Sequence, residues 1–212
     1  VQTLLSGPVG GTIAGVTVFN DLKDLSKNGL ICMDMGGTSF DVSIVIDGKA
    51  QIELDSNIDG HDLLAPSVAI HTIGAGGGSV TEFKSGTINV GPRSASSNPG
   101  PICYDHGGTE ITITDANLVL GRISKKLSFG NDIKLNYEET SSKMNELGEK
   151  LKLSGNQVAE GIIKIADGNM SNAIRELTVF RGLDPRDYAL MAFGGAGPLH
   201  TVALAEELGI ST

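Results

Sequence analysis

The 212-residue chain has few cysteines, fewer basic than acidic residues and no long apolar run. Its two cysteines, Cys32 and Cys103, do not suggest a disulfide framework, so we expect a protein of the reducing cytoplasm. Sixteen basic and 25 acidic residues give a net charge of −9, which argues against a nucleic-acid partner. No apolar run approaches the roughly 20 residues of a transmembrane helix, so we expect no membrane partner.

Glycine, in contrast, is abundant. The 29 glycines are about twice the usual share, and they gather in short clusters. Such clusters favour turns that hold a phosphate or another ligand over a flexible polymer. With 40% hydrophobic and 19% charged residues, the chain is long enough and apolar enough to form a sizeable core.

The most informative segment is a turn within residues 33–43. An apolar run ends at Asp34, glycines and hydroxyls follow, and Asp41 opens a second apolar run, which predicts strand, tight turn and strand. Backbone N–H groups, two hydroxyls and two carboxylates can together hold phosphate oxygens and hydrated Mg²⁺. No Gly-Lys-Ser/Thr follows and no helix begins there, so it is not a P-loop. The alternative is an ordinary polar hairpin turn. The candidate residues are Asp34, Gly36, Gly37, Thr38, Ser39 and Asp41.

The first part of the chain is predicted to hold a short helix and a hairpin before a glycine-rich insert. Small and apolar residues indicate a tightly packed helix over 12–20, and Asp47-Gly48 is a hairpin turn signal. The insert, at about 56–130, is rich in glycine and proline. Strands are expected at 30–35, 40–47, 49–54, 87–90 and 110–114, and Asp115 is expected to cap a helix over 116–121.

Helical periodicity replaces this pattern from about residue 137. Ser154 is predicted to cap a long helix that ends near Gly182. A strand over 188–193 then leads into a glycine turn, and a last helix covers 200–208. The backbone of that turn can approach adenosine or its phosphates at a helix N-terminus. The alternative is a tight connection that needs glycine for steric reasons. The turn residues are Gly194, Gly195, Ala196 and Gly197.

Three other groups of residues have more than one interpretation. His71 can form a substrate- or metal-facing site with the loop of Gly76, Gly77, Gly78 and Ser79, or it can be a buried, hydrogen-bonded histidine. Cys103, Asp105 and His106 have ligand chemistry but lack the four-ligand spacing of a zinc site, so a small core cysteine is favoured. Close helix packing is the favoured explanation of Gly10 and Gly11.

Seven stretches of the chain, taken in order, carry a resemblance to a known family. They are residues 5–11, 34–42, 71–79, 91–95, 99–104, 114–122 and 193–200. On them the chain resembles the hydantoinase A / 5-oxoprolinase family, including N-methylhydantoinase A-like proteins and subunits of acetone and acetophenone carboxylases. The order of the glycine turns also resembles the second half of the actin-like ATPases. The chain departs from the family at Ala69, Arg93 and Asp105, where Asp, Glu and Gly are common, and this leaves the substrate open.

The resemblance implies an α/β fold. We expect half of an actin-like (ribonuclease-H-like) ATPase, with a mixed sheet flanked by helices and the glycine-rich insert containing β-structure. Residues 1–212 would form one hydantoinase A-type domain. The family's first domain carries a second Asp-x-Gly-Gly-Thr turn that we do not find, so we expect a fragment that holds half of an ATP site.

The resemblance also implies an activity, which is ATP-dependent opening of a cyclic amide such as hydantoin or 5-oxoproline. ATP would phosphorylate the amide oxygen and make the ring open to attack by water. Asp34, Asp41 and His71 would be catalytic, with Mg²⁺ held by Asp34 through water. Expected partners are the missing first domain and a hydantoinase B-type subunit or domain. The alternatives are a carboxylase subunit of the acetone or acetophenone type and a non-catalytic nucleotide-binding module.

Overall fold

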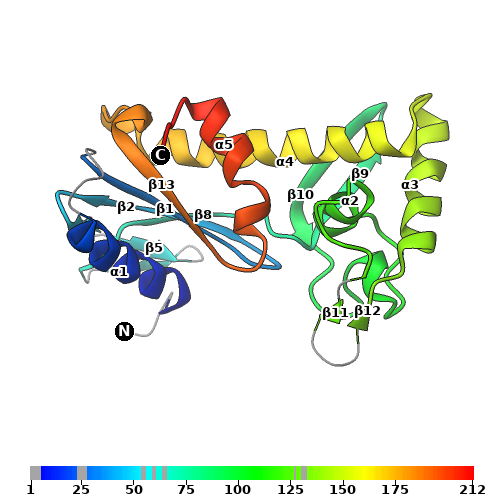
Figure 1. Cartoon of the computed structure of the whole chain (residues 1–212), viewed down its shortest axis with the longest axis horizontal. Coiled ribbons are helices and arrows are strands. Elements are labelled where there is room, and N and C mark those ends of the chain that lie inside the picture. Colours follow the sequence, from blue (N-terminus) through cyan, green and yellow to red (C-terminus); the bar gives the residue numbers. More distant parts are fainter. Residues whose placement is uncertain are drawn as a thin grey trace. The chain divides into compact units, whose positions relative to one another are not determined.

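The structure is a computed structural model that describes residues 6–22, 28–53, 56–58, 61–63, 66–126, 128–129 and 133–212. Leu5 and Leu54, which belong to the first motif and to an expected strand, lie outside the described residues. The chain forms two units (Figure 1). One unit consists of Val1–Asp34, Phe40–Ile73 and Ser171–Thr212, and the other of Met35–Ser39 and Gly74–Met170. The insert was predicted to begin at about residue 56, whereas the long segment of the second unit begins at Gly74.

A five-stranded mixed sheet organises the first unit. The order is β13-β1-β2-β3, and β8 also pairs with β2. Strand β13 runs parallel to β1, whereas β3 and β8 run antiparallel to β2. The predicted α/β class with a mixed sheet is therefore confirmed. The strands are β1 (Gly29–Met35), β2 (Phe40–Ile46), β3 (Lys49–Ala50), β8 (Ile70–Ile73) and β13 (Tyr188–Phe193).

The predicted hairpin is present, but its second arm is short. Asp47 and Gly48 both have positive φ, as a tight two-residue turn requires. Strand β3 ends at Ala50 rather than continuing to 54. Ile52–Glu53 forms a separate strand, β4, that pairs with β7 (Ser67–Val68). A second small pair consists of β5 (Ser56–Ile58) and β6 (His61–Leu63).

Helix α1 (Ser6–Asp21) covers one face of the sheet. Val16 and Phe19 of α1 pack against a buried cluster that includes Leu30 and Cys32 of β1. A Cβ atom on Gly15 would collide with the Cys32 sulfur, so this glycine permits the close approach. The predicted tight packing is confirmed, but the helix begins at Ser6 and includes the glycines expected to precede it.

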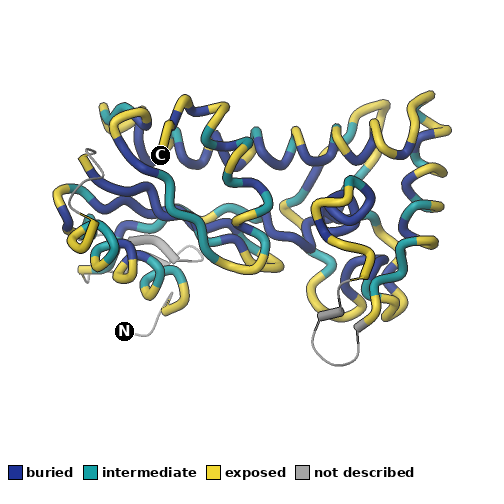
Figure 2. The backbone as a smooth tube through the Cα atoms, in the orientation of Figure 1, coloured by how far each residue is buried: buried dark blue, intermediate teal, exposed yellow. Residues whose placement is uncertain are grey.

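Apolar side chains also cover the other face, which explains why β1 and β2 are buried almost throughout (Figure 2). Ile44 and Ile46 of β2 line a hollow of about 180 Å³ with Leu177, the last residue of α4 (Gly155–Leu177). The Ser154 hydroxyl accepts a hydrogen bond from the Gln157 N–H, which confirms the predicted cap. Helix α4 ends before Gly182, because the 3₁₀ turn η2 (Val179–Arg181) intervenes.

The first unit ends with short elements that follow η2. These are the 3₁₀ turn η3 (Pro185–Asp187), strand β13, the 3₁₀ turn η4 (Gly197–Leu199) and helix α5 (Thr201–Leu208).

The second unit contains the hairpin β9 (Ser79–Lys84) and β10 (Thr87–Ser94), helix α2 (Ile113–Val119) and helix α3 (Tyr137–Leu151). It also contains the 3₁₀ turn η1 (Ile102–Tyr104), the pair β11 (Ser128–Phe129) and β12 (Ile133–Lys134), and most of α4. The strand predicted at 87–90 is longer than expected. None of the helices in the described part of the chain is long and apolar enough to cross a bilayer.

The prediction for residues 110–121 was wrong in two respects. A single bridge between Thr112 and Val80 stands where a strand was expected, and the helix begins at Ile113. Thr112, not Asp115, is the N-cap residue. The Thr112 hydroxyl accepts from the Asp115 N–H while the Asp115 carboxylate accepts from the Thr112 N–H. This reciprocal capping box places the acidic residue three positions inside the helix.

Candidate active site

Two of the predicted carboxylates lie on one face of the sheet. Asp34 follows Leu30 and Cys32 at alternate positions of β1, and alternate side chains of a strand share a face. Asp41 shares a face of β2 with Ser43, whose hydroxyl lies 2.7 Å from that of Thr12 in α1. Both carboxylates are therefore on the α1 side.

The surroundings of Asp34 change its ionisation. Asp41 is only 8% exposed. Burial and, to a smaller extent, the negative charge of Asp41 raise the pKa of Asp34. A raised pKa makes the Asp34 carboxylate a better proton acceptor than an ordinary aspartate.

This donor set is suited to magnesium rather than zinc. Magnesium takes one or two carboxylates and keeps several waters, whereas structural zinc needs four protein ligands. Asp34 and Asp41 can supply the two carboxylates. Among the described residues, no group of three or more His, Cys, Asp and Glu could hold a metal ion.

Asp41 has a hydroxyl partner that the sequence reasoning missed. Thr72 lies directly opposite Asp41 in the β2–β8 register, and its Oγ1 donates to Asp41 Oδ1 at 2.5 Å. The one signal for Thr72 in the sequence was its place in the 71–79 motif, beside His71.

His71 lies on the opposite face from the two carboxylates. It pairs with Val42, one residue along β2 from Asp41, so its side chain points away from the α1 side. There its Nε2 lies 3.0 Å from Oε2 of Glu176 in α4, and both side chains are partly exposed. The alternative of a buried histidine is therefore wrong, and joint action of His71 with Asp34 and Asp41 stays a prediction.

Residues 36–39, called here the 36–39 turn, are largely exposed and include backbone N–H groups that have no acceptor in the described part of the chain. Gly36, Gly37 and Thr38 are exposed. The carbonyls of Gly36 and Gly37 accept hydrogen bonds from the N–H groups of Gly77 and Gly78, at 2.9 and 2.7 Å. Within the described part of the chain, the N–H groups of Gly37 and Thr38 donate to no protein acceptor. An anion-binding turn requires backbone N–H groups that are available to a ligand, and here the carbonyls bond to the protein while these N–H groups do not.

Residues 76–79, called here the 76–79 loop, are buried and support that turn. A Cβ atom on Gly76 would overlap the backbone of Gly37 and Thr38, so any larger residue would displace the turn. The Gly77 carbonyl accepts from both the N–H and the hydroxyl of Thr114, each at 2.8 Å. Substrate contact by this loop stays a prediction, and the contacts seen are structural.

The last glycine turn leaves the sheet beside Asp34. In the parallel pair β1–β13, Asp34 lies opposite Phe193, the residue before Gly194. Gly194 has a φ of 82° and is exposed, as is Gly195. Ligands of open α/β sheets bind outside the carboxyl ends of parallel strands, which is the position of Asp34 and Gly194.

The N-terminal part of α1 reaches the same edge of the sheet. A Cβ atom on Gly11 would overlap the ring of Phe193, so packing explains this glycine, as predicted. A Cβ atom on Gly10 would meet nothing within 4 Å, so packing does not explain Gly10.

Comparison with known proteins identifies the family of the chain. The family model described as hydantoinase/oxoprolinase matches residues 1–212, which is the whole chain. The chain belongs to the hydantoinase/oxoprolinase family.

Proteins with named activities resemble the chain over nearly all its length. It is 39% identical to caprolactamase subunit alpha of Pseudomonas jessenii over 99% of the chain, and 39% identical to 5-oxoprolinase of Saccharomyces cerevisiae over 100%. A nucleotide-free structure of acetone carboxylase matches 98% of the chain with a TM-score of 0.88 and 31% identity. The chain spans 30%, 17% and 29% of these proteins, respectively.

Cys103 has a structural role in this hydantoinase/oxoprolinase chain. Both cysteines are free and buried. The Cys103 N–H donates to the buried carboxylate of Asp115 at 2.8 Å, and burial raises the pKa of the Cys103 thiol. Asp105 and His106 are exposed. These positions support the core interpretation of Cys103 over a zinc site.

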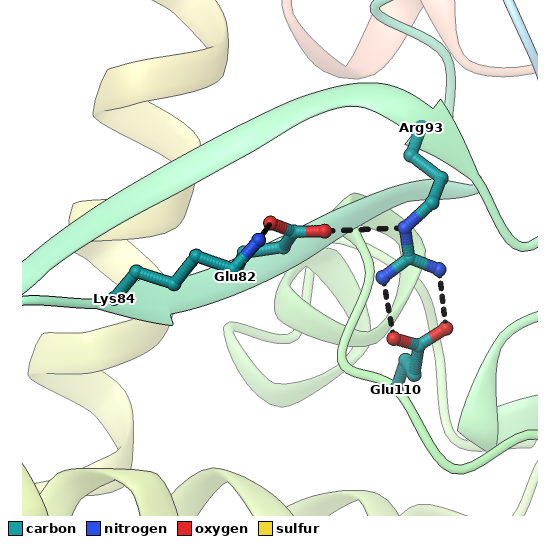
Figure 3. A network of polar contacts seen from close by, with 4 residues as sticks. All are labelled: Glu82, Lys84, Arg93 and Glu110. Carbon is teal, nitrogen blue, oxygen red and sulfur yellow. Dashed lines mark hydrogen bonds and ion pairs between the residues drawn. The ribbon is translucent and has the colours of Figure 1, made fainter.

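Arg93 lies at the centre of an exposed ion-pair network (Figure 3). Its guanidinium donates through two nitrogens to Glu110 and through Nε to Glu82, which also pairs with Lys84. Arg93 and Glu110 border a hollow of about 260 Å³. The two carboxylates thus offset the positive charge of Arg93.

Proposed function

We propose that this chain is a domain of an ATP-dependent hydrolase of cyclic amides. One observation carries the proposal: Asp34 and Asp41 share one face of the sheet, at the edge where the exposed Gly194 turn begins. Reacting groups and a nucleotide-binding turn are thereby close to one another. The similarity to a caprolactamase and a 5-oxoprolinase, both named for cyclic amides, supports the substrate class.

The chemistry begins with an amide that is a poor electrophile. Transfer of the terminal phosphoryl group of ATP to the amide oxygen releases ADP and makes the ring carbon electrophilic. Water then adds to that carbon, the C–N bond breaks and the ring nitrogen leaves with a proton. A second water hydrolyses the acyl phosphate that results, so one ATP and two waters give an amino acid, ADP and phosphate.

The surroundings of each residue indicate its proposed part in nucleotide binding or proton transfer. The outward N–H groups of Gly37 and Thr38 bind phosphate oxygens, and the backbone of Gly194 and Gly195 approaches the nucleotide. Asp34 accepts a proton from the attacking water. Asp34 and Asp41 would hold Mg²⁺ through water, and the ion would supply positive charge to offset that of the transferred phosphoryl group.

Other parts of the enzyme complete the site in this proposal. Because the chain spans 30% of the caprolactamase subunit and 17% of the yeast 5-oxoprolinase, we assign the other half of the ATP site to a domain beyond these residues. A hydantoinase B-type subunit is the proposed partner, and one relative is itself named as a subunit. The cytoplasmic location stays a prediction.

The second candidate function is that of an ATP-dependent carboxylase subunit. The TM-score of 0.88 with acetone carboxylase favours it, because the shared fold covers 98% of the chain. Both candidates depend on ATP, so the nucleotide turns alone do not separate them. A non-catalytic nucleotide-binding module is the remaining alternative.

The test is phosphate release by the full-length protein with its partner subunit. Hydantoin, 5-oxoproline, caprolactam and acetone with bicarbonate are supplied in turn. We expect a cyclic amide to stimulate release and Asp34→Asn to lower the stimulated rate by at least about 100-fold. Stimulation by acetone with bicarbonate alone would establish the carboxylase, and stimulation by no substrate would favour the non-catalytic module.

The matched control for this test is Asp184→Asn. Asp184 is an exposed carboxylate in the first unit that pairs with Arg186 two residues away. The same chemical change there should leave the stimulated rate unchanged.

A further inference from the structure

We infer that Thr72 is a positioning residue that fixes the carboxylate of Asp41 for the reaction. The inference rests on the proposed function and adds to it a residue on β8. It replaces the predicted grouping of His71 with the carboxylates by a set of Asp34, Asp41 and Thr72. The three residues of this set lie on the same face of the sheet.

The β2–β8 ladder sets this geometry. Asp41 and Thr72 are directly opposed residues of antiparallel strands, and opposed side chains point to the same side of a sheet. Threonine is branched at Cβ, so few χ1 rotamers are open to it and the direction of its hydroxyl is well defined. The resulting O–H···O⁻ bond is charge-assisted and stronger than a bond between neutral groups.

A second hydroxyl pair on the same face provides a contrast. Two residues along β2, Ser43 bonds to Thr12 of α1, and both residues are buried. That pair joins a helix to the sheet inside the core. Thr72, in contrast, is exposed, yet its hydroxyl is directed to a carboxylate that is only 8% exposed. Thr72 therefore contributes little to packing, and we expect its substitution to affect the orientation of the Asp41 carboxylate.

Orientation matters because transfer chemistry requires reacting groups to be placed within fractions of an ångström. The bond from Thr72 restrains the position of Oδ1 of Asp41. Loss of the hydroxyl would remove this restraint without removing the charge of the carboxylate. Residues that orient a ligand side chain in this way commonly contribute 10- to 100-fold to affinity or activity.

The experiment compares Thr72→Val and Thr72→Ser in the full-length enzyme with its partner subunit. Valine keeps the shape and removes the hydroxyl, whereas serine keeps the hydroxyl. We expect Thr72→Val to lower kcat by about 10- to 100-fold and to change the KM for ATP by less than about 3-fold. Thr72→Ser should stay within about 3-fold of the wild-type kcat, and both variants should unfold at the wild-type temperature.

A second readout keeps the test independent of the substrate. Mn²⁺, a spectroscopic substitute for Mg²⁺ at carboxylate sites, is titrated into the protein in the presence of ADP while free Mn²⁺ is measured by electron paramagnetic resonance. Thr72→Val should weaken Mn²⁺ binding by about 10-fold, and Thr72→Ser should not. Thr17→Val is the matched control, because the exposed Thr17 hydroxyl donates to a backbone carbonyl within α1.

The outcomes separate the two proposals. If no cyclic amide stimulates the wild-type enzyme, the proposed function is contradicted. The Mn²⁺ affinities of Thr72→Val and Thr72→Ser would then test the positioning role of Thr72. Wild-type kcat and wild-type Mn²⁺ binding in Thr72→Val would overturn the inference. Equal impairment of the serine and valine variants would overturn it too, because the hydroxyl would then not be the cause.

Discussion

The 36–39 turn and the 76–79 loop are both rich in glycine, but their glycines have opposite environments. A Cβ atom on Gly36 or Gly37 would meet nothing within 4 Å, whereas one on Gly76 would overlap backbone atoms. The turn is exposed, and its Gly37 and Thr38 N–H groups donate to no acceptor in the described part of the chain, whereas the loop is buried and its N–H groups bond to the turn. The turn glycines thus leave open space next to the backbone, whereas Gly76 in the loop permits close contact with the turn.

The largest effect that would test this contrast is expected from Gly76→Ala. The added methyl group overlaps the backbone of Gly37 and Thr38, and no flexible side chain can yield to relieve the overlap. We expect a loss of about 3 kcal/mol in the free energy of unfolding, measured by chemical denaturation. The ATP-dependent activity should be lost as well, because the turn is displaced.

Gly86→Ala is an unsuitable control for this change, because Gly86 has a φ of 82° and alanine would be strained there. Gly36→Ala is the better one, since its methyl group meets no protein atom. Wild-type stability in Gly76→Ala would contradict the assignment of this loop as a support.

A smaller effect is expected from Thr114→Val, which weakens the contact between α2 and the 76–79 loop. Valine keeps the N–H bond to the Gly77 carbonyl and removes the one from the hydroxyl. Because Thr114 is buried, we expect a loss of about 1 kcal/mol in the free energy of unfolding. Chemical denaturation measures it, with Thr114→Ser as the variant that keeps the bond. If the two variants are equally stable, the hydroxyl does not hold the loop.

The sequence predicted the elements next to the site better than it predicted their partners. The strands around Asp34 and Asp41 and the turn after Phe193 follow from local patterns of apolar residues and glycine. The pairing of β1 with β13 joins segments more than 150 residues apart, and no local pattern fixes such a register. The contact of Thr72 with Asp41 also depends on a strand register, which is why it was missed.

The same limit applies to single residues. The sequence could not show that the Gly76 position touches the 36–39 turn, so the supporting role of its loop was missed, while substrate contact by the loop stays a prediction. His71 and Thr72 are neighbours in the chain, and strand alternation sends them to opposite faces. A motif therefore identifies which residues matter together, but the fold decides which of them meet.

The smallest effect on stability, and the sharpest test of the contrast, is expected from Gly37→Ala. Its φ is outside the left-handed region and its methyl group would point into open space, so alanine fits the folded protein. We expect the free energy of unfolding to change by no more than about 0.5 kcal/mol. The same open space is where a phosphate would approach the backbone, so the affinity for ATP with Mg²⁺ should fall by about 10-fold. Calorimetry on the full-length protein measures this, and unchanged affinity would show that the exposed turn does not contact the nucleotide.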